Sequence, residues 1–255
     1  LVGSEMCIRD SSHSGAVETE IAGVACHIIP GLSAFVGGDI TAGILASGML
    51  EQEASTLLID LGTNGEMALG NRHRLHACAT AAGPAFEGGA NRGIWGADMV
   101  RLLQKLLEEG LMDGQGLLKE PYFTKGVRIG DVLVTKESVR AVQLAKGAIA
   151  AGIEILADSY GIRFSDISKV VLAGGFGYYL DPKAAVAIGL LPEELADCTV
   201  TGGNTALSGA AMVGSRILTA GGKQTAEGTL PDGGDDLRKR QELQIRILNL
   251  AEEEK

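Results

Sequence analysis

Two glycine-rich turns, each preceded by a run of apolar residues, constrain the fold of this chain most. The first run, residues 57–61 (LLIDL), carries an acid and is followed by residues 62–65 (GTNG). The second run, residues 170–173 (VVLA), is followed by residues 174–177 (GGFG). Glycine lets backbone N–H groups approach a phosphate closely, and an acid at the end of a strand can hold a hydrated metal ion. The pair of turns therefore predicts a nucleotide held between two loops.

The first turn does not belong to either of two common nucleotide-binding patterns. No Lys-Ser or Lys-Thr follows it, as a Walker loop requires, and neither turn has the Gly-x-Gly-x-x-Gly spacing of dinucleotide sites. Asn64 and Gly65 are instead typical of a hairpin corner. Alternation continues through residues 67 and 69, and a third run covers residues 75–80, so the sequence predicts an antiparallel meander. A tight hairpin without a ligand is the alternative explanation of this turn.

Several further segments, taken in order, resemble a known family. They are residues 35–43 (FVGGDITAG), 59–66 (IDLGTNGE), 81–89 (AAGPAFEGG), 142–149 (VQLAKGAI), 172–177 (LAGGFG) and 187–192 (AIGLLP). Together they resemble the actin-like ATPase fold shared by acetate and sugar kinases, heat-shock chaperones and actin, and more narrowly the carboxy-terminal ATPase region of the reductive activases of corrinoid proteins. The resemblance covers about residues 20–220. It implies an α/β fold of the actin-like, ribonuclease H-like type, with antiparallel hairpins in a mixed sheet flanked by helices.

The resemblance also implies a site for ATP and Mg²⁺. Asp60 would hold magnesium through water or orient the attacking water, and Glu87 is a second catalytic candidate. The residues implied to bind the nucleotide lie in the two turns, in the 35–43 segment and on a long helix; they are Asp39, Gly62, Thr63, Asn64, Gly65, Gln143, Lys146, Gly174, Gly175, Phe176 and Gly177. Each has an alternative without a ligand: Asp39 can cap a helix, Glu87 can be a solvated loop acid, and the long-helix residues can be ordinary surface.

Local patterns predict the helices around these turns. A short helix capped by Asp39 should end near Gly48, and an amphipathic helix is expected over residues 97–110. The long helix should begin at Thr135, whose hydroxyl can cap it, and stop at Gly161. The absence of side chains at Gly174 and Gly175 would let a purine-ribose lie directly on the backbone, where a valine would fill that space.

Composition narrows the class of partner. With 255 residues, 45% of them hydrophobic, the chain can bury one substantial core or two modest ones. A formal net charge of −10 without a stripe of Lys and Arg argues against nucleic acid. Every apolar stretch is interrupted before the ~18 residues that a membrane span needs, so no membrane span is predicted and a cytoplasmic location is expected.

Cysteine and histidine spacing predicts no metal or disulfide site in this chain. The four cysteines, Cys7, Cys26, Cys78 and Cys198, are far apart and form no Cys-x-x-Cys pair, which favours reduced thiols. His73 and His76, three apart on a strand-like run, should point to opposite faces, unlike a metal pair. The resemblance places an iron–sulfur cluster only on a separate amino-terminal domain, which is absent from this chain.

The expected organisation has four parts. Residues 1–11 resemble a translated sequencing-adapter or transposon-end sequence, and residues 12–222 are expected to form a partial ATPase lobe. Residues 223–236 are expected to be a linker or loop, and residues 237–255 a truncated helix and strand segment. Proteins of the family have an earlier lobe with another Asp-x-Gly-Thr loop, and none precedes Phe35 here. The chain is therefore expected to be an incomplete ATPase.

The function that the resemblance implies is reductive activation. Activases of this kind couple ATP to reduction of inactive Co(II) corrinoid to Co(I) on a partner corrinoid protein or methyltransferase, and a homodimer is expected. A sugar-type kinase and an activator of 2-hydroxyacyl-CoA dehydratases are alternatives, although the latter would carry cluster-binding cysteines that are missing here. A nucleotide-silent dimerisation or docking module is a further alternative.

Overall fold

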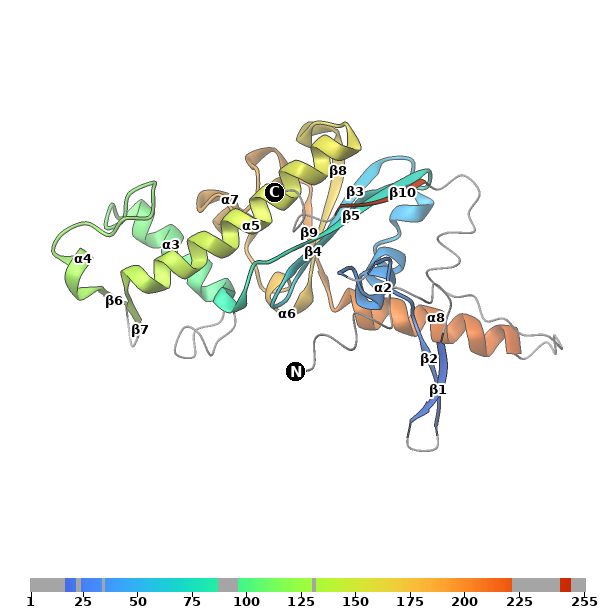
Figure 1. The fold of residues 1–255 in the computed structure, drawn as a ribbon. Helices are drawn as coiled ribbons and strands as arrows, with labels where there is room; N and C mark the ends of the chain where they lie inside the picture. The colour runs from blue at the N-terminus through green and yellow to red at the C-terminus, as the bar shows by residue number, and fades with distance from the viewer. Residues whose placement is uncertain are drawn as a thin grey trace.

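A six-stranded mixed sheet forms the centre of the computed structural model, which describes residues 17–21, 24–33, 35–86, 96–129, 132–221 and 244–248 (Figure 1). The strand order is β10–β5–β4–β3–β8–β9. The bounds are β3 (Ser55–Leu61), β4 (Gly65–Gly70), β5 (Arg74–Thr80), β8 (Ile167–Ala173), β9 (Thr199–Gly203) and β10 (Gln244–Leu248). The first three form the antiparallel meander, β8 and β9 run parallel to β3, and β10 runs parallel to β5. This arrangement confirms the predicted α/β fold.

Helices cover both faces of the sheet. The helices of the described residues are α2 (Gly38–Ser47), α3 (Gly96–Glu108), α4 (Tyr122–Lys125), α5 (Lys136–Tyr160), α6 (Gly174–Gly177), α7 (Pro182–Ala187) and α8 (Thr205–Gly221). Helix α5 crosses one face, and α2 lies against the other with α8 packed on it (Figure 1). Two separate hairpins, β1 (Val17–Ile21) with β2 (Val24–Ile28) and β6 (Val127–Ile129) with β7 (Val132–Val134), lie outside the sheet.

Alternation along β3 divides its side chains between two cores. Leu57 and Ile59 point to the face covered by α5, where they belong to the same buried cluster as Ile149. Leu58 points to the opposite face and joins a second buried cluster with Ile40 of α2. Because successive strand residues face opposite sides, a strand buried on both faces is apolar throughout. The apolar run over residues 57–61 therefore reflects a central strand, interrupted only by Asp60.

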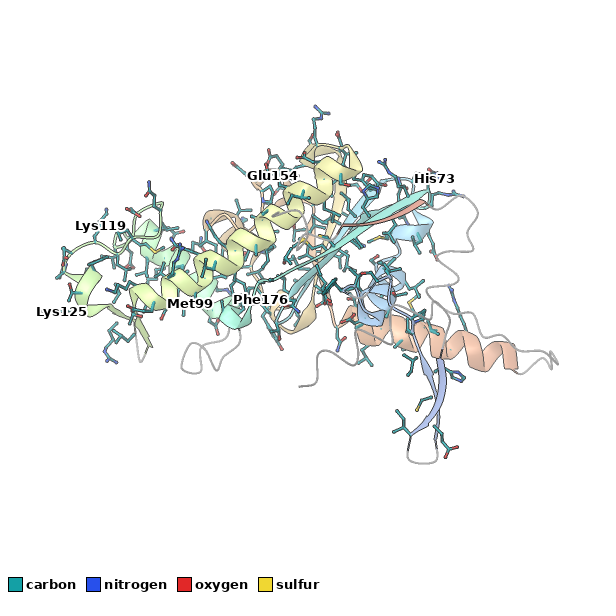
Figure 2. All side chains as sticks on the ribbon, viewed as in Figure 1. His73, Met99, Lys119, Lys125, Glu154 and Phe176 are labelled. Atoms are coloured by element: carbon teal, nitrogen blue, oxygen red, sulfur yellow. The ribbon has the colours of Figure 1, made fainter. Side chains whose placement is uncertain are left out.

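The predicted ends of the long helix are confirmed. The Thr135 hydroxyl accepts a hydrogen bond from the Ser138 N–H at 3.4 Å, and Gly161 closes α5 with a left-handed φ of 78°. Helix α3 begins one residue earlier than predicted, and it buries Met99 (Figure 2) and Leu106 as its amphipathic pattern requires. Helix α2 ends at Gly48, the predicted position, and Gly48 has the left-handed conformation.

Two local predictions need correction. Asp39 does not cap α2: the capping position belongs to Gly37, and Asp39 lies in the first turn with its carboxylate accepting from the Ile40 N–H at 2.8 Å. An acid in the first turn is still favourable there because the helix dipole places positive partial charge at this end. The hairpin corner is also shifted: the turn is residues 62–64, and Gly65 is already the first residue of β4, paired with Leu61.

The structure tests the predicted histidine and cysteine roles within the residues it describes. His76 is buried with its ring edge-on to Tyr160, while His73 is exposed and contacts Glu53, so the two do not form a metal pair. Cys78 and Cys198 are free thiols, and burial raises the pKa of Cys78 to about 12. In the same parts of the chain, no helix is both long and apolar enough to cross a membrane.

Some predictions fall outside the described residues. These are the parts assigned to residues 1–11 and 223–236, and Glu87. Of the 237–255 segment, the structure describes β10, which confirms the strand predicted from its alternation.

Candidate nucleotide site at the strand ends

The three parallel strands β3, β8 and β9 end at the same edge of the sheet. Asp60 is the register partner of Ala173, and Ala173 is in turn the partner of Gly203. The second glycine-rich turn begins immediately after this row, and the first begins one residue further along, after Leu61. The carboxyl ends of parallel strands are the usual place for ligands in open α/β sheets, because the turns and helix N-termini that follow them converge there.

The two turns adjoin at Gly174. A Cβ atom on this residue would lie 2.4 Å from the Asp60 Oδ1 atom and 2.6 Å from the Leu61 carbonyl oxygen. Its φ of 83° also lies in the left-handed region that favours glycine. Gly174 is therefore required for the close approach of one turn to the other. This corrects the expectation that its missing side chain makes room for a purine-ribose.

Gly175 behaves differently from its neighbour. A Cβ atom on Gly175 would meet no protein atom within 4 Å, and the residue is exposed. The space that a ligand could occupy is thus beside Gly175. Phe176 and Gly177 are buried: the Phe176 ring stacks on Phe86 with centroids 4.2 Å apart and planes 9° apart. These last two residues support the turn from below.

Three carboxylates gather on the α2 face of the sheet. Asp60 and Glu66 are register partners across the β3–β4 hairpin, so their side chains share one face. Asp39 reaches the same region from the first turn of α2, close enough to influence both. Burial, and then the charge of Asp39, raise the pKa of Asp60 to about 6. Burial, Asp39 and then Asp60 raise the pKa of Glu66 to about 7.

Glu66 is a site residue that the sequence reasoning did not select. Glu66 pairs with Asp60 because the turn is residues 62–64; the predicted corner at Asn64 and Gly65 would have paired Glu66 with Thr63, so the sequence pattern did not point to Glu66. Asp39, Asp60 and Glu66 form no ion pair with any other described residue. The repulsion among them would be relieved by a cation.

The carboxylates fit one mode of magnesium binding and not another. The described residues contain no group of three or more His, Cys, Asp or Glu side chains positioned to hold a metal ion directly. Mg²⁺ usually retains several waters and uses one or two carboxylates together with substrate phosphates. Asp60 and Asp39 therefore fit a hydrated magnesium ion that is also bound by phosphate oxygens.

The first turn has a more limited set of donors than the sequence suggested. The Gly62 N–H already donates to the Asn64 carbonyl at 3.0 Å inside the turn. Thr63 and Asn64 are exposed, so the outer part of the turn faces solvent. Gly65 is buried, with its absent Cβ 2.7 Å from the Thr80 hydroxyl oxygen, and this hydroxyl donates to the Gly65 carbonyl at 2.9 Å. Gly65 thus has a packing role in the hairpin.

Gln143 and Lys146 lie on α5 and contact backbone carbonyls on other segments. The Gln143 side-chain amide donates to the Gln115 carbonyl, and the Lys146 ammonium donates to the Ile188 carbonyl. Neither bond joins these side chains to the two glycine-rich turns. Their predicted contact with adenosine stays a prediction, and in this structure both are engaged in holding loops onto α5.

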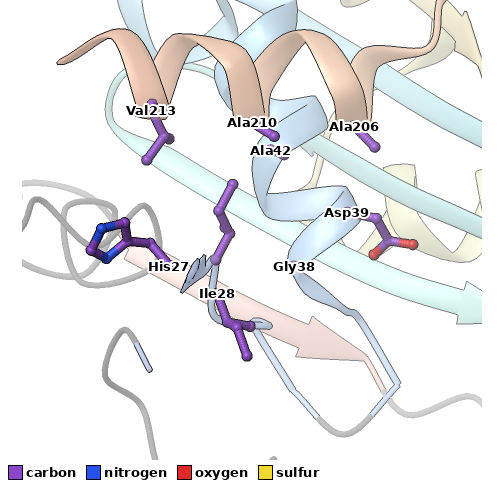
Figure 3. Close-up of a pocket in the computed structure, with 10 residues that line it drawn as sticks. His27, Ile28, Gly38, Asp39, Ala42, Ala206, Ala210 and Val213 are labelled. Atoms are coloured by element: carbon purple, nitrogen blue, oxygen red, sulfur yellow. The ribbon is translucent and has the colours of Figure 1, made fainter. Parts of the chain in front are cut away.

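An open pocket of about 520 Å³ lies next to the acidic cluster. Figure 3 shows Asp39 and His27 at opposite ends of it, with Ala206 and Val213 of α8 along one side. Helix α8 packs closely on α2 at Gly209, because a Cβ atom on this residue would lie 1.9 Å from the Ala42 carbonyl oxygen of α2. Asp39 therefore connects this pocket with the strand ends.

A protein-family description matches most of this region. The family described as the C-terminal domain of RACo, the ASKHA domain, matches residues 54–92 and 89–219. The chain belongs to this ASKHA family. Both glycine-rich turns and all three strand ends of the ASKHA site lie within the match, whereas Asp39 precedes it. The family expected from the resemblance is confirmed.

Curated relatives and a solved structure agree with this assignment. The corrinoid activation enzyme RamQ of Eubacterium limosum is 35% identical, with 65% of this chain and 37% of that protein covered. The [Co(II) methylated amine-specific corrinoid protein] reductase of Methanosarcina barkeri is 27% identical, with 72% of this chain and 43% of that protein covered. The solved structure of a reductive activator for corrinoid, iron-sulfur protein superposes with a TM-score of 0.74 at 27% identity, and the match covers 90% of this chain and 42% of that one. The ASKHA chain thus spans about two fifths of these relatives' lengths.

Proposed function

We propose that this chain is the ATP-binding and ATP-hydrolysing lobe of a reductive activator that acts on a corrinoid protein. The observation that carries the proposal is the contact of Gly174 with Asp60, which joins two glycine-rich turns to a carboxylate at the ends of parallel strands. The names of the relatives support the choice of corrinoid protein as partner. Homodimerisation and an iron–sulfur domain elsewhere in the full protein remain predictions.

The site residues would divide the work of hydrolysis. Asp60 and Asp39 would hold hydrated Mg²⁺, which supplies positive charge to the phosphates when bound. Backbone N–H groups at the start of α6 and around Thr63 would stabilise negative charge on the phosphates. Asp60 or Glu66 would orient the attacking water. Glu66 is protonated over a larger part of the neutral range than Asp60, so Asp60 is the better acceptor at pH 7.

ATP hydrolysis would serve the partner through conformational change. The cobalt of the corrinoid would take up one electron, Co(II) becoming Co(I), from the iron–sulfur centre of the full protein. The lobe itself would supply no electron. Nucleotide-dependent closure would change how the corrinoid protein docks and thereby how readily its cobalt is reduced.

Equilibrium binding of labelled ATP with Mg²⁺ tests the site. We expect Asp60→Asn and Gly175→Val each to weaken binding at least ~10-fold, because the first removes a metal-binding charge and the second fills the open space beside the turn. Asp158→Asn on the exposed end of α5 and Gly114→Val, where a Cβ also meets open space, are matched controls. Binding equal to wild type in both site variants would refute the site and favour a nucleotide-silent docking module.

A further inference from the structure

A pair of exposed tyrosines follows the second glycine-rich turn. Tyr178 is 51% exposed and Tyr179 is 65% exposed, and their rings are edge-on with centroids 4.8 Å apart and planes at 79°. Large aromatic side chains usually bury most of their surface. Two adjacent exposed tyrosines at a predicted nucleotide turn therefore need an explanation.

The backbone places Tyr178 directly at the strand ends. Its N–H donates to the Gly174 carbonyl at 3.2 Å, one helical turn after the glycine that touches Asp60. The Tyr178 ring also lies against the end of β9, since a Cβ on Gly203 would be 3.6 Å and 3.8 Å from two of its carbon atoms. Gly203 is the last member of the row that begins at Asp60. The ring is thus part of the same edge of the sheet.

The two tyrosines are held differently. The Tyr179 carbonyl accepts a hydrogen bond from the Arg101 guanidinium of α3 at 3.4 Å, which attaches this residue to the neighbouring helix. Tyr178 is oriented by Gly203 and by the edge-on ring of Tyr179, and about half of its surface remains accessible. The open space at Gly175 lies three residues before it on the same turn. An oriented aromatic surface beside an open space suits a flat, aromatic ligand group.

We propose that Tyr178 provides the stacking surface for the purine base of the nucleotide. This inference rests on the proposed function, because the phosphates bound near Asp60 and Gly174 would bring the base to this edge. Stacking of one base on an aromatic side chain strengthens binding about 5- to 150-fold. Since every base has a π-face, Tyr178 would contribute affinity and not the choice between adenine and guanine.

Calorimetric titration of the whole chain with ATP and with inorganic tripolyphosphate, both with Mg²⁺, tests the proposal. Tyr178→Ala should weaken ATP binding about 5- to 150-fold and leave tripolyphosphate binding unchanged, because tripolyphosphate has no base. Tyr178→Phe keeps the ring and should bind ATP within about twofold of wild type. Phe123→Ala, which removes an exposed aromatic ring on α4, is the control and should also stay within about twofold of wild type.

The remaining outcomes separate this inference from the proposed function. Unchanged ATP binding by Tyr178→Ala would overturn the stacking role. An equal loss of affinity for ATP and for tripolyphosphate would also overturn it, because it would show that Tyr178 only supports the turn. Wild-type protein that binds tripolyphosphate as tightly as ATP would overturn it as well while leaving the phosphate site intact. Wild-type protein that binds neither compound would refute the proposed function itself.

Discussion

Asp60 and Glu66 face each other as register partners across the β3–β4 hairpin, on the sheet face that α2 covers. The pair is partly buried, and Asp39 adds a third negative charge nearby. A site of this kind holds its charges at the expense of stability until a cation binds.

The acidic pair should make the protein less stable as the pH rises. The raised pKa of Glu66, about 7, means that the folded chain binds more protons than the unfolded chain between about pH 4.5 and pH 7. The free energy of unfolding should therefore fall over this range and then level off. Glu66→Gln should be more stable than wild type at pH 8, by about 1 kcal/mol after solvent screening, with the difference vanishing near pH 4.5.

Urea unfolding at several pH values measures this effect. Glu154→Gln, on the exposed side of α5, is the control and should keep the wild-type slope (Figure 2). If the wild-type protein gained stability relative to Glu66→Gln between pH 5 and pH 7, the pKa of Glu66 would not be raised in the folded chain.

Magnesium-dependent nucleotide binding should depend on pH in the opposite sense. The pKa of Asp60 is raised to about 6, so at pH 5.5 most of the free protein carries a protonated Asp60. ATP with Mg²⁺ should then bind about 3- to 10-fold more weakly at pH 5.5 than at pH 8. Asp60→Asn experiences the same titration of ATP but lacks this carboxylate, and it should show a flatter pH profile. Identical pH profiles of ATP binding for wild type and Asp60→Asn would show that Asp60 is not part of the binding site.

Gly174→Ala should destabilise the fold where Gly175→Ala does not. At position 174 the new Cβ atom clashes with the Asp60 carboxylate, and the alanine must adopt a left-handed φ. Together these effects should lower the free energy of unfolding by about 2–4 kcal/mol. At Gly175 the new Cβ meets open space, and the change in unfolding free energy should stay within about 1 kcal/mol. Thermal and urea unfolding measure both, and equal effects would show that the two turns do not adjoin as described.

The close packing of α8 on α2 should make Gly209 sensitive to substitution and leave Gly214 tolerant. Gly209→Ala places a Cβ 1.9 Å from the Ala42 carbonyl oxygen and should destabilise by about 2–3 kcal/mol. Gly214→Ala, on the same helix with no atom within 4 Å of its Cβ, should be neutral or stabilising by up to about 1 kcal/mol. Because Asp39 lies on α2, Gly209→Ala should also weaken nucleotide binding. A tolerated Gly209→Ala would mean that the helices pack less closely.

The local patterns of the sequence were sufficient for the elements around the site. Thr135 and Gly161 mark the ends of α5 because capping and the left-handed conformation depend on neighbouring backbone alone. The meander of β3, β4 and β5 followed from alternation and a short turn. Six ordered motifs identified the family, since their order is far more specific than any single glycine turn.

The tertiary structure decided the roles of individual residues. Glu66 became a site residue through hairpin register, and Asp39 lost its capping role because Gly37 takes that position. Gly174 proved to be a packing requirement, since only the parallel pairing of β3 and β8 brings it to Asp60 across more than a hundred residues of chain. Short-range preferences act between neighbours in sequence, whereas which carboxylates share a buried face depends on strand order and helix packing.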